Sequence, residues 1–343
     1  MKLKTLLGVA LAVLLTGVAL ADTIALNPNH PDRYVVVKGD TLWDIAGRFL
    51  KDPWHWPEVW YVNPQIKNPH LIYPGDVITL SYVNGKPRLA VQRGRPTVKL
   101  SPHARPEPLT RAIPTIPIDA IQQFLTQPLV TDKNELKNAP YVVEIAQEHV
   151  IGGPGDQMYV RGLKSSGHTR YSVYRPGKPL VDPDTNEVLG YQAIFVGDAT
   201  LKRFGDPSTL VLTKADREAL VGDRVRPVSQ EQIKANFMPH APKQNVDGRI
   251  ISVLGGVSQI GQYQVVVLNR GRREGLNPGT VLAIYQTGRV IRDTVSDKHG
   301  DTVKLPDERA GELMVFRSFD RVSYGLVMRA TRALHVEDRV RNP

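Results

Sequence analysis

The sequence has 343 residues, of which 41% are apolar and 23% are charged, and its formal net charge is +10. This length is enough to bury a core and to form two or three domains. The chain contains no cysteine, which excludes disulfide bridges, a lipid-modified cysteine and every thiol-based peptidase or transpeptidase.

Residues 1–21 have the pattern of a secretory signal peptide. Lys2 and Lys4 precede an apolar run over residues 6–18, and Ala19-Leu20-Ala21 has the small-x-small pattern of a cleavage site. The run is short for a membrane-spanning helix, and no later apolar run approaches the necessary length. We therefore expect an exported mature chain without a transmembrane segment, which suits a bacterial periplasm. No nucleic-acid partner is expected there.

Residues 34–80 are predicted to form a compact unit that starts with a strand and a helix. The apolar run YVVV precedes the stretch GDTLWDIA, in which Thr41 and Asp44 have the spacing of a capping box. In that motif the hydroxyl accepts from the amide three residues on, and the carboxylate reaches back to the first amide. Leu42, Ile45, Ala46 and Phe49 follow with helical spacing, which predicts one apolar helix face.

A second short helix and a second strand complete this unit. Pro57 is suited to a first helical position, Trp56, Val59 and Trp60 share one face, and Asn63 precedes a proline that ends the helix. The tetrapeptide YPGD, residues 73–76, has proline and glycine at the central positions of a type II turn and leads into VITL. The predicted order is βααβ, with the two strands adjacent and antiparallel.

The segments YVVVKGDTLWDIAGRFL and NPQIKNPHLIYPGDVITL resemble a LysM domain. The resemblance implies recognition of peptidoglycan or chitin, with N-acetylglucosamine-containing glycan held in a shallow groove between two loops. By that resemblance, the glycan-binding residues are Gly39, Asp40, Thr41 and Leu42 on one side and Asn63, Pro64, Ile66 and Asn68 on the other. Each also has a purely structural alternative, as a turn, a cap or part of the core. Whether Trp54 and Trp56 pack inside the domain or stack on sugar stays open.

Residues 81–118 are predicted to be a basic, proline-rich linker. They contain seven arginines and lysines against one glutamate, and also seven prolines. At about 3.1 Å per residue, such a segment could span on the order of 100 Å. The basic charge would suit an anionic polymer, anionic lipid or an acidic partner, and the alternative is a solvated spacer.

The remaining chain is predicted to be mainly β, in two related modules over residues 119–240 and 247–343, after a short helix near residues 119–125. The segments YQAIFVGD and TLVLT resemble ELMVFR and GLVMR in order and spacing, and PGKPLVDP resembles QTGRVIRD. Both modules end alike, in LVGDRVRP and HVEDRVRNP. In these ends the Gly-Asp or Glu-Asp pair predicts a turn into a final strand, with the arginines on an exposed face. The fold class is therefore α+β, and chance similarity between hairpins is the alternative to a repeat.

A single LysM-like unit, a basic linker and a β-rich region with NRGRREGLNPGTVLAIY and a terminal DRVR together resemble the type IV pilus secretin-associated family. That resemblance implies a periplasmic, wall-associated scaffold that holds peptidoglycan and associates with an outer-membrane secretin ring, which would place it peripheral to the outer membrane. Its C-terminal region would be similar to that of a flagellar accessory protein. It assigns no contact role to Arg224, Arg226, Arg339 or Arg341.

A general wall-binding factor and a cell-wall hydrolase are the alternatives. Zinc peptidases need clustered ligands, whereas the nine histidines are scattered without an HxH or HExxH pattern. There is no GxSxG nucleophile motif. Carboxylates such as Glu144, Glu148 or Asp156 could still meet another carboxylate in space for glycan cleavage. We therefore expect a non-catalytic protein without metal or cofactor.

Overall fold

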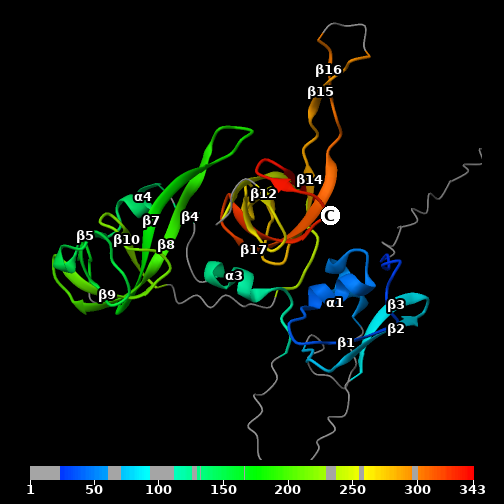
Figure 1. Cartoon of the computed structure of the whole chain (residues 1–343), viewed down its shortest axis with the longest axis horizontal. Coiled ribbons are helices and arrows are strands. Elements are labelled where there is room, and N and C mark those ends of the chain that lie inside the picture. The colour runs from blue at the N-terminus through cyan, green and yellow to red at the C-terminus, as the bar shows by residue number, and fades with distance from the viewer. Residues whose placement is uncertain are drawn as a thin grey trace, which may run out of the picture.

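The computed structural model describes residues 24–60, 71–92, 112–125, 130–131, 133–165, 167–228, 237–254, 259–295 and 300–343. This part of the chain is mostly β and forms a small α/β unit followed by two barrels (Figure 1). The predicted signal peptide, residues 1–21, lies outside the described residues. In the described part, no helix has both the length and the apolar character that a bilayer crossing needs.

In its described residues, the N-terminal unit contains one three-stranded antiparallel sheet, in the order β1-β2-β3, two α-helices and one 3-10 helix. Its elements are β1 (Arg33–Val35), α1 (Leu42–Phe49), the 3-10 helix η1 (Pro53–His55), α2 (Trp56–Val59), β2 (Val77–Val83) and β3 (Lys86–Gln92). The predicted apolar face of α1 is confirmed, because Leu42, Ile45, Ala46 and Phe49 all lie in the core of this unit. The predicted turn before β2 is also confirmed, since Gly75 has φ +96° and the Asp76 amide donates to the Tyr73 carbonyl at 3.0 Å.

The start of α1 differs in one detail from the predicted capping box. Thr41 is the N-cap, and its hydroxyl accepts from the Asp44 amide at 3.1 Å as expected. The Asp44 carboxylate, however, accepts from the Thr41 hydroxyl at 2.7 Å and, through its other oxygen, from the Tyr263 hydroxyl at 3.1 Å. Asp44 therefore connects the helix cap to a distant part of the chain.

The predicted linker over residues 81–118 is wrong at both of its ends. Residues 81–92 continue β2 and form β3, where Leu89 is fully buried in the core of the N-terminal unit. Residues 112–117, which we call the strap, lie along the same unit: the Ile113 amide donates to the Ile72 carbonyl at 2.8 Å. Burial of Leu89 holds the first end, and burial of Ile113 and Ile116 holds the second, together with backbone hydrogen bonds. Residues 93–111 lie outside the described part of the chain.

The first barrel is formed by six strands that close into a ring in the order β10-β5-β6-β9-β8-β7. The short strand β4 (Val130–Thr131) pairs with β8 outside this ring, and α4 (Lys133–Lys137) follows it. The ring elements are β5 (Tyr141–Ile145), β6 (Gln157–Arg161), β7 (Arg170–Val181), β8 (Val188–Arg203), β9 (Ser208–Ala215) and β10 (Arg224–Pro227), with the 3-10 helix η2 (Ala146–Glu148) after β5.

The second barrel closes with the same strand order as the first, β20-β11-β13-β18-β17-β14. Its elements are β11 (Asp247–Val253), β13 (Val265–Leu268), β14 (Val281–Gln286), β17 (Glu308–Ser318), β18 (Ser323–Ala330) and β20 (Arg339–Arg341), with the 3-10 helix η3 (Arg272–Glu274) after β13. The segments compared in the sequence occupy equivalent strands: β8 and β17, β9 and β18, and β10 and β20. Both final strands follow a turn with positive φ, at Gly222 and at Glu337.

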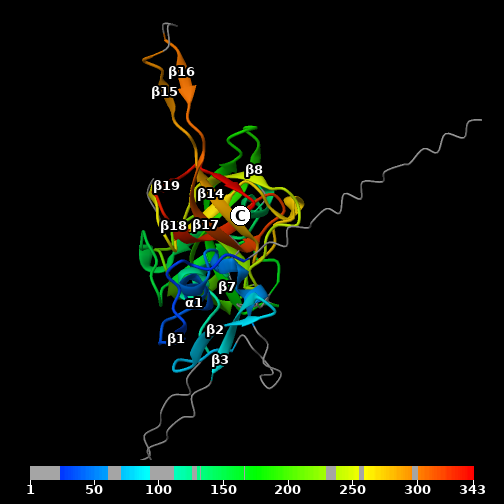
Figure 2. The same ribbon diagram turned by 90° about the vertical axis from the view of Figure 1, so that its right-hand side faces the viewer.

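Two small two-stranded sheets accompany the second barrel. One pairs β12 (Gln259–Ile260) with β19 (Leu334–His335), and the other pairs β15 (Val290–Arg292) with β16 (Thr302–Lys304). Figures 1 and 2 show the β15–β16 hairpin projecting away from the barrel.

The arginines of the final strands β10 and β20 are half-buried, whereas the sequence predicted that they would be exposed. Arg226 pairs with Glu135 at 2.6 Å, and Arg339 pairs with Asp247 at 2.9 Å.

The strands of the second barrel are apolar on both faces. Alternate residues such as Val266, Leu268, Leu282 and Val315 form one cluster that fills the barrel. The residues between them, including Val267 and Phe316, form a second cluster on the outer face. This outer face is covered by Trp43 of α1, Ile116 of the strap, Ile121 of α3 (Ile118–Leu125) and Leu180 of β7. Helix α3 thus packs on the second barrel, whereas the predicted modules placed it with the first.

Candidate functional site

A cavity of about 740 Å³ lies beside the first group of predicted glycan-binding residues. We call it the groove cavity. Gly39, Asp40 and Thr41 form one wall, the strap forms another, and Tyr263 contributes from the second barrel. The volume falls in the range typical of small-molecule binding pockets.

Gly39 and Asp40 shape the loop between β1 and α1. Gly39 has φ +101°, a conformation that favours glycine, and no atom lies within 4 Å of the position that a Cβ would take. Asp40 is only 8% exposed. Its Oδ2 accepts from the Tyr34 hydroxyl at 3.0 Å and from the Val37 amide at 2.9 Å. One oxygen of Asp40 is therefore used to hold the loop.

Thr41 and Leu42 also have structural roles in this site. The Thr41 hydroxyl caps α1, and the Leu42 side chain is 2% exposed within the core of the N-terminal unit. Leu42 is one of the residues that the LysM resemblance places at the glycan, but helical periodicity turns its side chain inward. Only its backbone faces the strap.

The strap supplies hydrogen-bond acceptors to the start of α1. The Leu42 amide donates to the Pro114 carbonyl at 3.0 Å, and the Trp43 amide donates to the Thr115 carbonyl at 3.1 Å. The first amides of a helix have no acceptor within the helix, and here the strap provides acceptors for two of these amides. Since the strap also bonds to Ile72, it crosses from the segment before β2 to the start of α1.

Burial of two isoleucines fixes the strap in place. Ile113 is 8% exposed in the core of the N-terminal unit, and Ile116 is fully buried against the second barrel. Each burial contributes about 1.5–3 kcal/mol, and each of the three backbone hydrogen bonds about 0.5–1.5 kcal/mol. A sugar that binds with millimolar affinity gains only about 4 kcal/mol. A weakly bound glycan therefore does not displace the strap.

Tyr263 connects the second barrel to the groove cavity. Its hydroxyl donates to Asp44 Oδ1 at 3.1 Å. Burial, and secondly the negative charge of Asp44, raises the pKa of Tyr263 to about 12, so the hydroxyl stays protonated and continues to donate. The ring is partly buried against the outer cluster of the second barrel and lines the cavity.

The sequence predicted one wall of this site and missed two others. Gly39, Asp40 and Thr41 are brought together at the cavity, whereas Asn63, Pro64, Ile66 and Asn68 lie outside the described residues. The strap had a signal that could have found it: the stretch AIPTIPI contains three isoleucines in an otherwise polar segment. Tyr263 had none, because its proximity to Asp44 depends on how two units pack.

The tryptophans between the helices pack inside the protein. Trp56 is 2% exposed in the core of the N-terminal unit and lies edge-on to Trp60. Trp54 stacks on His55 at a ring separation of 3.6 Å and packs against the outer cluster of the second barrel. Their packing answers the question that the sequence left open for these two side chains.

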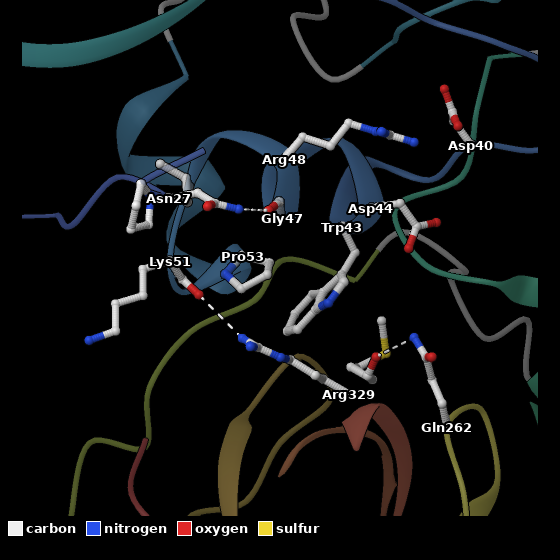
Figure 3. A pocket seen from close by; sticks show the side chains of 13 residues that line it. Asn27, Asp40, Trp43, Asp44, Gly47, Arg48, Lys51, Pro53, Gln262 and Arg329 are labelled. Atoms are coloured by element: carbon white, nitrogen blue, oxygen red, sulfur yellow. Dashed lines mark hydrogen bonds between the residues drawn. The ribbon is translucent and has the colours of Figure 1, made fainter. Parts of the chain in front are cut away.

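A second cavity, of about 580 Å³, lies on the other side of α1, between this helix and the second barrel. Figure 3 shows Arg48 and Lys51 above it, with Arg329 and Gln262 contributed from below. The Arg48 guanidinium lies over the Tyr34 ring at 4.4 Å, and Arg329 donates to the Lys51 carbonyl at 3.5 Å. The cavity therefore lies between polar side chains of the N-terminal unit and polar side chains of the second barrel, next to the buried Trp43.

The metal ligands and carboxylates that catalysis would need are a separate question. Within them, no group of three or more histidine, aspartate or glutamate side chains could hold a metal ion. Asp156, one of the carboxylates considered for glycan cleavage, accepts from the Gly153 amide at 2.7 Å and closes a turn. The groove cavity offers carboxylate and carbonyl acceptors beside apolar groups, which suits a ligand with hydroxyl and amide groups.

Comparison with known proteins identifies the N-terminal unit. Residues 34–81 match the LysM domain family. The uncharacterized protein YqbP of Bacillus subtilis is 40% identical over 60 residues, which cover 15% of this chain and 27% of that protein. The chain thus spans about a quarter of the length of this relative. Residues 34–81 are a LysM domain, a peptidoglycan-binding and non-catalytic module.

Proposed function

We propose that this protein is a non-catalytic scaffold of the periplasm that holds peptidoglycan through its LysM domain and an outer-membrane secretin ring of the type IV pilus through its barrels. The observation that carries the first half is the LysM match over residues 34–81, together with the groove cavity beside Gly39, Asp40 and Thr41. The second half rests on the resemblance of the whole chain to secretin-associated proteins. Export by a signal peptide over residues 1–21 is part of the same proposal.

The chemistry of the groove cavity supports a neutral acetamido sugar as the ligand. Apolar groups such as Pro117 and Ile118 can cover the faces of a sugar ring, and carboxylates and carbonyls can accept from its hydroxyl and amide groups. In this proposal the second side of the groove is formed by Asn63, Pro64, Ile66 and Asn68.

Retention on insoluble peptidoglycan tests the LysM part of the proposal. Asn63→Ala combined with Asn68→Ala should reduce the amount of protein that sediments with the wall, because two polar side chains of the groove are removed. Asn29→Ala, at an exposed position of the same unit, is the control. Asp40→Ala is less suitable, since Asp40 holds the loop to Tyr34. Equal retention of the double variant and the control would mean that the groove is elsewhere.

Co-isolation from the natural host tests the secretin part. The tagged full-length protein and its Asn63→Ala, Asn68→Ala variant are purified from solubilised envelopes, and the captured proteins are identified by mass spectrometry. We use the full chain because the LysM domain covers part of the second barrel through Trp43. Recovery of a secretin with both proteins supports the scaffold. If no secretin is recovered with either, a general wall-binding accessory factor is what remains, with a cell-wall hydrolase the least favoured alternative.

A further inference from the structure

The LysM loop that faces the groove cavity has few polar groups left for a ligand. Asp40 Oδ2 is bonded to Tyr34 and Val37, and the Thr41 hydroxyl is bonded to Asp44. The amides of Leu42 and Trp43 are bonded to the strap. Groups outside the LysM domain are therefore needed to complete recognition on this side.

Such groups are present on the other walls of the same cavity. The strap presents the apolar rings of Pro114 and Pro117, and Tyr263 presents an aromatic ring. Asp119, in the first turn of α3, is exposed and lines the cavity, and no hydrogen bond to its carboxylate is formed within the described part of the chain. Apolar faces beside a free carboxylate match the faces and hydroxyl groups of a sugar.

These walls are a permanent part of the site. Ile113 and Ile116 anchor the strap in two different cores, and Tyr263 is bonded to Asp44 at 3.1 Å. The cavity between them has the volume of a pocket for a small ligand with the strap in place. A glycan can therefore enter beside the strap without removing it.

We propose that the glycan site of this protein is composite: N-acetylglucosamine units bind in the groove cavity between the LysM loop, the strap, Asp119 and Tyr263. The inference rests on the proposed peptidoglycan-binding function and names the further residues that the ligand contacts. Asp119 accepts from sugar hydroxyl or amide groups, and the Tyr263 ring covers one face of a sugar. Neither residue belongs to the matched LysM range of residues 34–81.

Isothermal titration of the full-length protein with N-acetylchitotetraose tests the composite site. Asp119→Ala and Tyr263→Ala should each weaken binding by about five- to tenfold, as expected for loss of one hydrogen bond or one ring contact. The matched controls are Asp32→Ala and Tyr82→Ala, which change exposed residues on the N-terminal unit away from the cavity. Both controls should bind as tightly as the unchanged protein.

The possible outcomes separate this inference from the proposed function. If the unchanged protein binds neither the tetrasaccharide nor insoluble peptidoglycan, the proposed function fails first. If it binds and Asp119→Ala has unchanged or higher affinity, the composite site is wrong, and higher affinity would show that this wall obstructs the ligand. Thermal unfolding and near-ultraviolet circular dichroism check the variants. Should Tyr263→Ala be unfolded, Asp119→Ala decides alone, since its exposed side chain has no bond to lose within the described structure.

Discussion

At the residue scale, the two barrels form the turn before their final strand with different amino acids. Asp223 and Asp338 occupy equivalent positions, and each accepts at 2.8 Å from an amide three residues earlier, that of Leu220 or of His335. The preceding residue has φ +92° at Gly222 and φ +77° at Glu337. The left-handed conformation suits glycine and strains glutamate.

Substitutions at this turn should have opposite signs in the two barrels. Gly222→Ala should lower the free energy of unfolding by about 1–2 kcal/mol through backbone strain. The added Cβ would not clash, since no atom lies within 4 Å of its position, so strain is the whole effect. Glu337→Gly should raise it by about 0.5–1 kcal/mol, since relief of strain exceeds the extra entropy of the unfolded chain. Urea unfolding curves measure both. A loss of stability in Glu337→Gly would contradict the equivalence of the turns.

Glu312 is a second residue whose environment has a measurable consequence. It is 3% exposed on β17, and its Oε1 accepts from Arg309 at 2.9 Å. Burial raises the pKa of Glu312, against the opposing effect of Arg309. The folded protein therefore binds this proton more tightly than the unfolded chain, and the resulting stability is lost as the pH rises above the ordinary glutamate value of about 4.3.

Glu312→Gln should flatten that part of the pH dependence. The amide keeps an acceptor for Arg309 but has no proton to lose, so the fall in unfolding free energy above about pH 4.3 should be smaller in the variant. Urea unfolding between pH 4 and pH 7 measures the difference. Glu144→Gln, which changes an exposed side chain on β5, is the control. Identical pH profiles for Glu312→Gln and the unchanged protein would rule out this role for Glu312.

At the element scale, the strap links two cores. Ile116→Ala should reduce the free energy of unfolding by about 2–5 kcal/mol, because it leaves a cavity beside Trp43 and Phe316. Ile151→Ala, at a position that is 53% exposed, should change it by no more than about 0.5 kcal/mol. Chemical unfolding followed by tryptophan fluorescence measures both. If Ile116→Ala changed the free energy of unfolding as little as Ile151→Ala does, the strap would not be anchored by burial of Ile116.

Local patterns predicted the elements of this fold better than their partners. Helix α1 followed from helical spacing and a cap, and the turn at Gly75 followed from its proline and glycine, because both depend on neighbouring residues. Closure of the barrels did not follow, since pairing such as that of β11 with β20 joins distant segments. The burial of Leu89 and the packing of the strap were not predicted, because the high proline and charge content of residues 81–118 outweighed a few isolated apolar residues.

The apolar runs of the second barrel contained more information than their assignment as strands. In VVVL of β13 and LMVF of β17, every residue is buried, which is typical of strands covered on both faces. The sequence thus indicated that something covers the outer face of the barrel. It could not indicate that Trp43 does so, because tryptophan in a small domain is equally suited to that domain's own core.

At the scale of the whole molecule, polar contacts add to these apolar ones. The segment between β7 and β8 reaches the second barrel, where Asp182 accepts from Asn269 at 3.0 Å and Asp184 pairs with Arg249 at 2.9 Å. The second barrel also contacts the LysM domain, where Arg309 pairs with Asp52 at 3.6 Å. The second barrel is therefore the central unit, with contacts to both others.

Because of the strap, the covalent connection through residues 93–111 is not needed to hold the LysM domain against the rest of the protein. Its two flanks, β3 and the strap, are both fixed to the LysM domain, so the connection starts and returns at the same unit. A specific protease site inserted there, once cut, should give two fragments on a denaturing gel that still migrate together in gel filtration. The strap, Trp43 and the Asp44–Tyr263 bond would hold them. Separation under native conditions would mean that the peptide chain itself is the tether; co-migration would mean that this molecule remains whole when severed.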